Sequence, residues 1–316
     1  MKHAALLLTA IMAAATPVMA IAASERSGFS AQGDFSESAV FRGVKATKEQ
    51  CDAVNNAVWA STKDHGEECL KYWAAGFSGK NTHRAIVFFH GDIWVGAGKT
   101  SKDYLRMSNR ALQQDVDDWS RKLAAPYIFL ARPGTHGSSG NHMQRRRVAE
   151  SVLISSALDK IKDKLNIGEF VVAGQSGGGH VTSSLITYRS DMVCAVPTSA
   201  PSSPRVRWLH RGLTRDTTGY ADSYEPNEHL RKDRVHEKLR VFVLGNPDET
   251  NVVWPSQVIM AVKLKEAGIP VEILHGKGSG PDGHGLKNSA RIVAGWCFHD
   301  NATQEILRKS VDALRG

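Results

Sequence analysis

The chain has 316 residues, four cysteines and a formal net charge of +8 at pH 7. This length suits one large domain with a sizeable core, and no stretch after the first twenty residues is apolar enough to span a membrane. The cations are scattered, and the one run, RRR at 145–147, is explained by a solvated helix face. We therefore expect no nucleic-acid partner.

The first twenty residues, MKHAALLLTAIMAAATPVMA, have the layout of a secretory signal peptide. One cation, Lys2, precedes an apolar run too short for a membrane span, and small residues follow up to Ala20. We expect cleavage after Ala20, with Ala22 or Ala23 as alternatives. The mature protein is predicted to be exported, to the periplasm or the medium.

Residues 21–83 are predicted to form an N-terminal extension with a helix and the first strands. The segment 46–62 has the pattern of a helix, which Thr47 and Gln50 open as a capping box. The segment 69–77 is a strand candidate.

The four cysteines allow three pairings in an oxidising compartment. Cys51–Cys69 is the most economical pair, because it ties the N-terminal helix to the strand that follows. Cys194 and Cys297 lie in apolar contexts and either pair with each other or remain buried thiols. No cysteine or histidine spacing indicates zinc, so we expect neither a metal nor a cofactor.

From residue 84 to residue 316, apolar strands alternate with helical patterns, which predicts one α/β domain. Continuous apolar strands separated by helices are typical of a mostly parallel sheet covered by helices on both faces. The strand candidates are 84–92, 126–134, 169–174, 193–198, 239–245 and 270–276. A polar insert at 201–238 interrupts the series, and we expect it to cover the site as a short cap.

The stretch VVAGQSGGGH, residues 171–180, contains the pattern G-x-S-x-G around Ser176. A nucleophilic serine at a strand-to-helix turn needs glycines two residues on either side, because side chains there would collide with the strand or the helix. The competing interpretation is a phosphate cradle. It is disfavoured because no lysine accompanies these glycines, and the GKT at 98–100 lacks the earlier glycine that a P-loop requires.

Two partners for Ser176 follow downstream, each just after an apolar strand. Asp248 is the predicted acid, with its neighbour Glu249 as the rival, and His284 is the predicted base, with His275 as the rival. A carboxylate holds the imidazole in the tautomer that lets it take the serine proton. The chain order Ser176, Asp248, His284 is the order found in α/β-hydrolases.

An oxyanion hole requires two N–H donors aimed at the developing negative charge. The backbone N–H of Gly177 is the first predicted donor. The second is the N–H of Asp92, because it follows His-Gly at the end of an apolar strand. Trp94, close by, lines the substrate pocket or belongs to the core.

On these motifs the chain resembles the α/β-hydrolase superfamily from residue 84 to the C terminus. The loop RPGTHGSSG at 132–140 is similar to an arginine-and-glycine loop of that superfamily. The segment 222–286 resembles the catalytic domain of prolyl-oligopeptidase-type serine peptidases and dienelactone-hydrolase-like enzymes. The resemblance implies the α/β-hydrolase fold and the same triad.

We therefore expect an exported serine hydrolase that cleaves an ester or amide through an acyl-enzyme intermediate. Its expected substrate is a small ester or a short peptide. The alternative is a non-catalytic binding protein that retains the fold, and activity on a generic activated ester would discriminate between the two.

Overall fold

The computed structural model describes residues 27–29, 35, 37–79, 81–93, 104 and 106–314. The predicted signal peptide, Trp94 and the GKT segment lie outside these described residues. Among the described residues, no helix is both long and apolar enough to cross a membrane.

The centre of the molecule is an eight-stranded sheet with the order β10-β9-β8-β7-β5-β6-β4-β3. Strands from β10 to β6 are parallel, whereas β4 runs antiparallel to both β6 and β3. The strands are β3 (Ala57–Thr62), β4 (Gly66–Ala75), β5 (Thr82–Phe89), β6 (Tyr127–Leu130), β7 (Ile167–Gln175), β8 (Met192–Thr198), β9 (Arg240–Gly245) and β10 (Val271–His275). The predicted, mostly parallel α/β sheet is confirmed.

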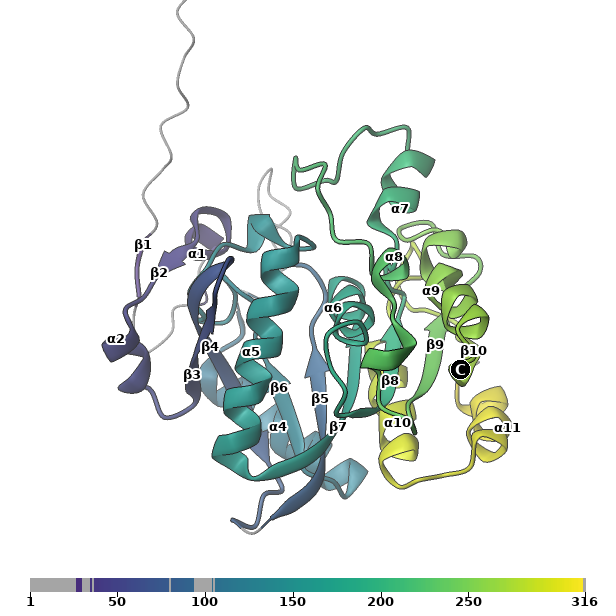
Figure 1. Ribbon diagram of the computed structural model, residues 1–316, viewed down its shortest axis with the longest axis horizontal. Coiled ribbons are helices and arrows are strands. Elements are labelled where there is room, and N and C mark those ends of the chain that lie inside the picture. The colour runs from purple at the N-terminus through teal and green to yellow at the C-terminus, as the bar shows by residue number, and fades with distance from the viewer. Residues whose placement is uncertain are drawn as a thin grey trace, which may run out of the picture.

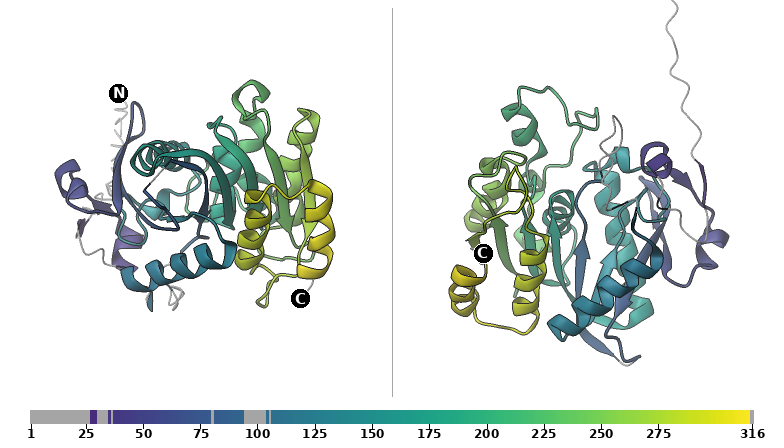
Figure 2. Two further views of the ribbon diagram at one scale, coloured as in Figure 1. Left: turned by 90° about the horizontal axis from the view of Figure 1, so that it is seen from below. Right: turned by 180° about the vertical axis from the view of Figure 1, so that it is seen from behind.

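Helices cover both faces of this sheet, as Figures 1 and 2 show. One face packs against α5 (Val148–Leu165), α6 (Gly177–Leu185) and α9 (Trp254–Glu266). The other face packs against α4 (Asn109–Leu123), α10 (Lys287–Phe298) and α11 (Thr303–Ala313). Because the central strands are buried on both faces, they are apolar throughout, and all seven residues of β8 are buried.

The N-terminal part differs from the sequence-based prediction. The capping box of Thr47 and Gln50 is present, but the helix α2 ends after five residues (Lys48–Asp52). The rest of the predicted helix is β3, an edge strand that pairs with β4. The sequence AVWAST of β3 contains a β-branched and an aromatic residue, which fit a pleated surface, and the pairing with β4 outweighs the local helical pattern. Further toward the N terminus, α1 (Glu37–Arg42) and the short pair β1 (Ser27–Gly28) and β2 (Val44–Lys45) lie outside the sheet.

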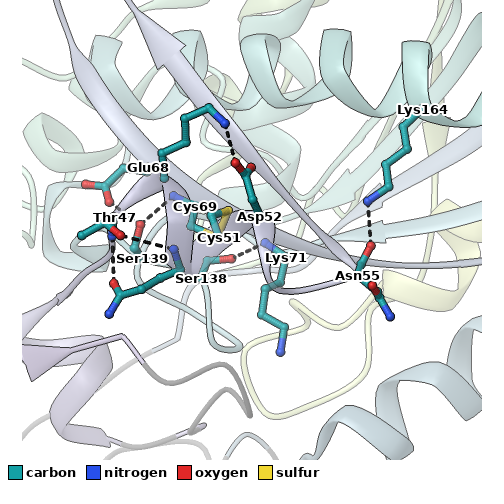
Figure 3. Close-up of a disulfide and its surroundings, with 12 residues drawn as sticks. Thr47, Cys51, Asp52, Asn55, Glu68, Cys69, Lys71, Ser138, Ser139 and Lys164 are labelled. Carbon is teal, nitrogen blue, oxygen red and sulfur yellow. Dashed lines mark hydrogen bonds and ion pairs between the residues drawn. A yellow bond between two sulfur atoms is a disulfide. The ribbon is translucent and has the colours of Figure 1, made fainter.

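Both cysteine pairs form disulfides. Cys51–Cys69 joins α2 to β4, and hydrogen-bonded polar residues lie around it (Figure 3). The N–H of Cys69 donates to Ser139 Oγ at 2.7 Å. Cys194–Cys297 joins β8 to α10 across 103 residues of sequence and resolves the alternative that the sequence left open.

The insert at 201–238 contains α7 (Pro204–His210), α8 (Pro226–His229) and the 3₁₀ helix η2 (Lys232–Arg234). In Figure 1, α7 rises above the carboxyl ends of the parallel strands. The predicted catalytic residues that the structure describes follow these ends, Ser176 after β7, Asp248 after β9 and His284 after β10. A further 3₁₀ helix, η1 (His142–Gln144), precedes α5.

Candidate active site

Ser176 stands at the sharp turn between β7 and α6. Its backbone angles are φ 59° and ψ −123°, in the region where residues other than glycine are strained. Its N–H donates to Thr198 O on the neighbouring strand at 2.8 Å, which fixes the turn. The residue is only partly buried. This strained and accessible position is what a nucleophile at a strand-to-helix turn requires.

The glycines next to Ser176 are required by space. A Cβ on Gly174 would overlap with the carbonyl oxygen of Gly178, and a Cβ on Gly178 would overlap with that of Phe89. The loop after β5 also approaches closely, since a Cβ on Gly91 would lie 3.2 Å from Ser176 Cβ. The G-x-S-x-G pattern therefore reflects close backbone packing around the serine.

His284 lies in the loop after β10 and pairs through Nδ1 with the carboxylate of Glu249. The Glu249 side chain is fully buried, whereas that of His284 keeps 16% of its surface exposed. Glu249 also accepts the N–H of Val252 at 2.8 Å and Gln257 Nε2 at 3.1 Å. Both oxygens of the Glu249 carboxylate therefore accept hydrogen bonds, and the carboxylate fixes the orientation of the His284 imidazole.

The acid that contacts His284 is therefore Glu249, and the assignment to Asp248 is corrected. The N–H of Glu249 donates to Asn246 O at 3.1 Å and closes a tight turn after β9. Within this turn Asp248 faces solvent, while Glu249 follows it and points into the protein. The rival base, His275, is exposed at the end of β10 and packs against Trp254, with 5.2 Å between ring centroids.

Gln175, which the sequence did not single out, ties the base loop to the serine turn. Its Nε2 donates to the carbonyl oxygen of His284 at 2.9 Å. Among the described residues, Ser176 Oγ and His284 share no direct hydrogen bond; catalytic hydrogen bonds often tighten only when substrate binds. The only feature of the sequence that could have indicated this role for Gln175 was its position next to Ser176.

The residues of the two predicted oxyanion donors, Gly177 and Asp92, are in close contact. A Cβ on Gly177 would overlap with the carboxylate of Asp92, so the loop after β5 touches the start of α6. The N–H groups of Gly177 and Asp92 have no acceptor within the described part of the chain. Trp94, which was predicted to line the pocket or belong to the core, lies outside the described residues.

Three arginines surround the carboxylate of Asp92, whose N–H is one of the two predicted oxyanion donors. Arg132 Nη1 donates to Oδ1 at 2.9 Å, Arg145 Nε lies 3.1 Å from Oδ2, and Arg146 Nη1 also pairs with Oδ2. Burial raises the pKa of Asp92, but Arg146, Arg145 and Arg132 outweigh it and hold that pKa well below its ordinary value. Asp92 is therefore ionised and paired.

The expectation that the RRR run is a solvated face is wrong for two of its three arginines, and only Arg147 is partly exposed. Arg145 and Arg146 are 2% and 0% exposed. Arg146 also donates to both oxygens of Asp216 in the insert, at 3.0 and 2.6 Å. Its carbonyl oxygen accepts the N–H of Tyr224, also in the insert, at 2.7 Å. Arg146 thus connects the loop after β5, through Asp92, to the insert, through Asp216; a local sequence pattern cannot reveal these partners.

Comparison with known proteins gives matches at the level of structure only. No protein-family model and no curated protein matches the chain. Prolyl oligopeptidase B from Galerina marginata has a TM-score of 0.51 and 13% identity, over 82% of this chain and 37% of that one. The chain spans 37 to 40% of the length of the peptidase structures that it matches.

Two esterases match over nearly their whole length. The esterase Pf2001 from Pyrococcus furiosus has a TM-score of 0.50 and 13% identity, over 84% of this chain and 96% of that one. Est1E from Butyrivibrio proteoclasticus has a TM-score of 0.50 and 10% identity, over 81% of this chain and 99% of that one. The chain has the α/β-hydrolase fold, as predicted. At these identities, the likeness describes the fold alone.

Proposed function

We propose that this protein is an exported serine hydrolase that cleaves an ester or amide through an acyl-enzyme intermediate. The proposed triad is Ser176, His284 and Glu249. An esterase or small-peptide hydrolase is favoured, because the site has only a short insert above it.

In this mechanism, Ser176 Oγ attacks the carbonyl carbon while His284 takes the serine proton. The oxyanion accepts hydrogen bonds from the N–H groups of Gly177 and Asp92. His284 then passes the proton to the leaving alcohol or amine as the bond to the acyl group breaks. Water, deprotonated by His284, then attacks the acyl carbon; the bond from Ser176 Oγ to the acyl carbon breaks, and His284 returns the proton to Oγ as the acid leaves. Glu249 stabilises the imidazolium during both steps.

The observation that carries this proposal is the convergence of three strand ends on one edge of the sheet. Ser176 follows β7 in a strained turn, Glu249 follows β9, and His284 follows β10 and pairs with Glu249. A histidine that is held by a buried carboxylate beside a strained serine is the geometry of a nucleophile, its base and an orienting acid. The structural neighbours, two esterases and a prolyl oligopeptidase, agree with it.

Export is proposed from two features. The first twenty residues have the layout of a signal peptide, and both cysteine pairs are disulfides. Disulfides persist in oxidising compartments. Sequencing the N terminus of the protein recovered from the medium or the periplasm tests this, and a retained leader in the cytoplasm would contradict it.

The test of the nucleophile is intact-protein mass after treatment with a fluorophosphonate. The wild type is expected to gain one adduct, and Ser176→Ala to gain none, because only an activated serine reacts quickly. Ser183→Ala is the matched control, since Ser183 is buried in the same helix and bonds to Ser202 Oγ. It should label like the wild type.

Absence of an adduct on folded wild-type protein, together with no hydrolysis of p-nitrophenyl acetate, would overturn the proposal. The fold would then serve a binding function. An adduct that persists in Ser176→Ala would move the nucleophile elsewhere.

A further inference from the structure

The buried charges around Asp92 balance one another. Arg132, Arg145 and Arg146 surround the carboxylate of Asp92. Two more carboxylates complete the group, because Glu150 accepts from Arg132 Nε at 2.8 Å and Asp216 pairs with Arg146. This cluster, which we call the Asp92 cluster, holds three cations and three anions. It needs no further counter-charge.

Arg207, in α7 of the insert, adds a cation that forms no direct ion pair with a described carboxylate. It is 5% exposed, and its Nε and Nη2 donate to neutral oxygens only, Asn251 O at 3.2 Å and Asn251 Oδ1 at 2.9 Å. The other buried arginines of the described chain each have a carboxylate within 4 Å, for example Arg189 with Asp191 and Arg291 with Asp115. Arg207 has none. Burying an unpaired cation is costly, so this position calls for an anion.

One side of Arg207 faces the loops that carry the triad acid and base. Its partner Asn251 lies two residues after Glu249 and donates through Nδ2 to Asp282 Oδ2 at 3.1 Å. Asp282 in turn accepts the N–H of His284 at 3.3 Å. Arg207 is therefore two contacts away from the base loop.

The Asp92 cluster lies close to Arg207 as well. Burial and the nearby Arg146 lower the pKa of Arg207 to about 10, while Asp92 and Asp216 act in the opposite direction. Arg207 remains a cation at neutral pH. Arg207 contacts the turn that carries Glu249 through Asn251, and its Nη1 is left without a hydrogen-bond partner in the described structure.

We propose that Arg207 binds an anionic group of the substrate, so that the ester or amide cleaved here carries a carboxylate or a similar oxyanion close to the scissile bond. The planar guanidinium suits such a group, because its N–H donors match two oxygens at once. This inference rests on the proposed function and narrows its substrate class. The alternative is that Arg207 only fastens α7 to the turn at Asn251.

The first experiment measures anion binding without catalysis. The melting temperature of the full chain is followed with increasing succinate at constant ionic strength, and dimethyl succinate serves as the uncharged control. Succinate should stabilise the wild type and Arg205→Gln, whose replaced side chain is exposed and paired with Glu228. Arg207→Met should lose this stabilisation. Arg207→Lys keeps the charge and should retain part of it.

The second experiment compares charged and neutral esters of the same shape. On the acyl side, mono-p-nitrophenyl glutarate is paired with its methyl ester. On the leaving-group side, 3-acetoxybenzoate is paired with methyl 3-acetoxybenzoate. The wild type should prefer the anion in one pair, and the ratio of kcat/KM values should fall by about 10- to 100-fold in Arg207→Met, the effect of a hydrogen bond to a charged group. Arg205→Gln should keep the wild-type ratio.

The outcomes separate the two proposals. Stabilisation by succinate that depends on Arg207 supports the anion site even if no ester is cleaved, in which case the hydrolase proposal alone fails. A charge preference that depends on Arg207 supports the site by itself. Hydrolysis with no such preference and no such stabilisation would overturn the inference and leave the hydrolase standing. If Arg207→Met does not fold, Arg207→Lys carries both comparisons.

Discussion

Replacing Glu249 with glutamine tests the acid that the tertiary structure selects. Three donors face the carboxylate: His284 Nδ1, the N–H of Val252 and Gln257 Nε2. An amide has one acceptor oxygen, so its NH₂ must face either His284 or Gln257. Gln257 is itself held by Val252 O at 2.6 Å and cannot turn without losing that bond. In either orientation, the negative charge beside the imidazolium is lost.

We expect Glu249→Gln to lower kcat by about 10²- to 10⁴-fold, or roughly 3 to 5 kcal/mol of transition-state stabilisation. The unsatisfied buried contact should also lower the free energy of unfolding by about 1 to 3 kcal/mol. Asp248→Asn is the matched control, because Asp248 is exposed, and it should leave kcat within about threefold of the wild type.

The assay is initial-rate hydrolysis of p-nitrophenyl acetate, with the rate of fluorophosphonate labelling as a second readout. A melting curve for each variant verifies folding. The reasoning is refuted if Glu249→Gln keeps near wild-type kcat, or if Asp248→Asn loses as much activity.

Three further predictions concern stability. Asp216→Asn should lower the free energy of unfolding by about 3 kcal/mol, because it removes a buried charged partner of Arg146. Asp222→Asn, which breaks an exposed ion pair, should lower it by under about 1 kcal/mol. Equal losses for the two variants in urea unfolding would contradict this. Replacing both Cys194 and Cys297 with serine should lower the free energy of unfolding by about 5 kcal/mol, because the disulfide restricts the unfolded chain across 103 residues. An unchanged urea midpoint would contradict this prediction. Burial lowers the pKa of His180 from 6.5 to about 4, so between these pH values the unfolded chain binds more protons than the folded one. The free energy of unfolding should therefore fall as pH falls, and His180 alone should account for about 2 kcal/mol between pH 6.5 and 5. In His180→Gln that part of the pH dependence should disappear, and an identical slope in both proteins would refute it.

The local sequence pattern was sufficient to predict the central strands and the turn at Ser176. Apolar runs such as 193–198 can be satisfied only between two layers of helices, so they predict a covered parallel sheet without knowledge of partners. The glycines around Ser176 predict the turn for the same reason, since the steric limits act between residues close in the sequence. The prediction of a helix over 46–62 was wrong because the pairing of β3 with β4, a tertiary contact, outweighed the local helical pattern.

Only the tertiary structure decided between Asp248 and Glu249, and only it revealed the burial of Arg145 and Arg146. Adjacent side chains in a turn point in different directions, so the choice of acid depends on a backbone geometry that the residue types do not encode. The RRR run looks solvated by composition, because the carboxylates that Arg146 pairs with lie 54 and 70 residues away in the sequence. A buried charge is stable only with its partner, and the fold alone brings the partners together.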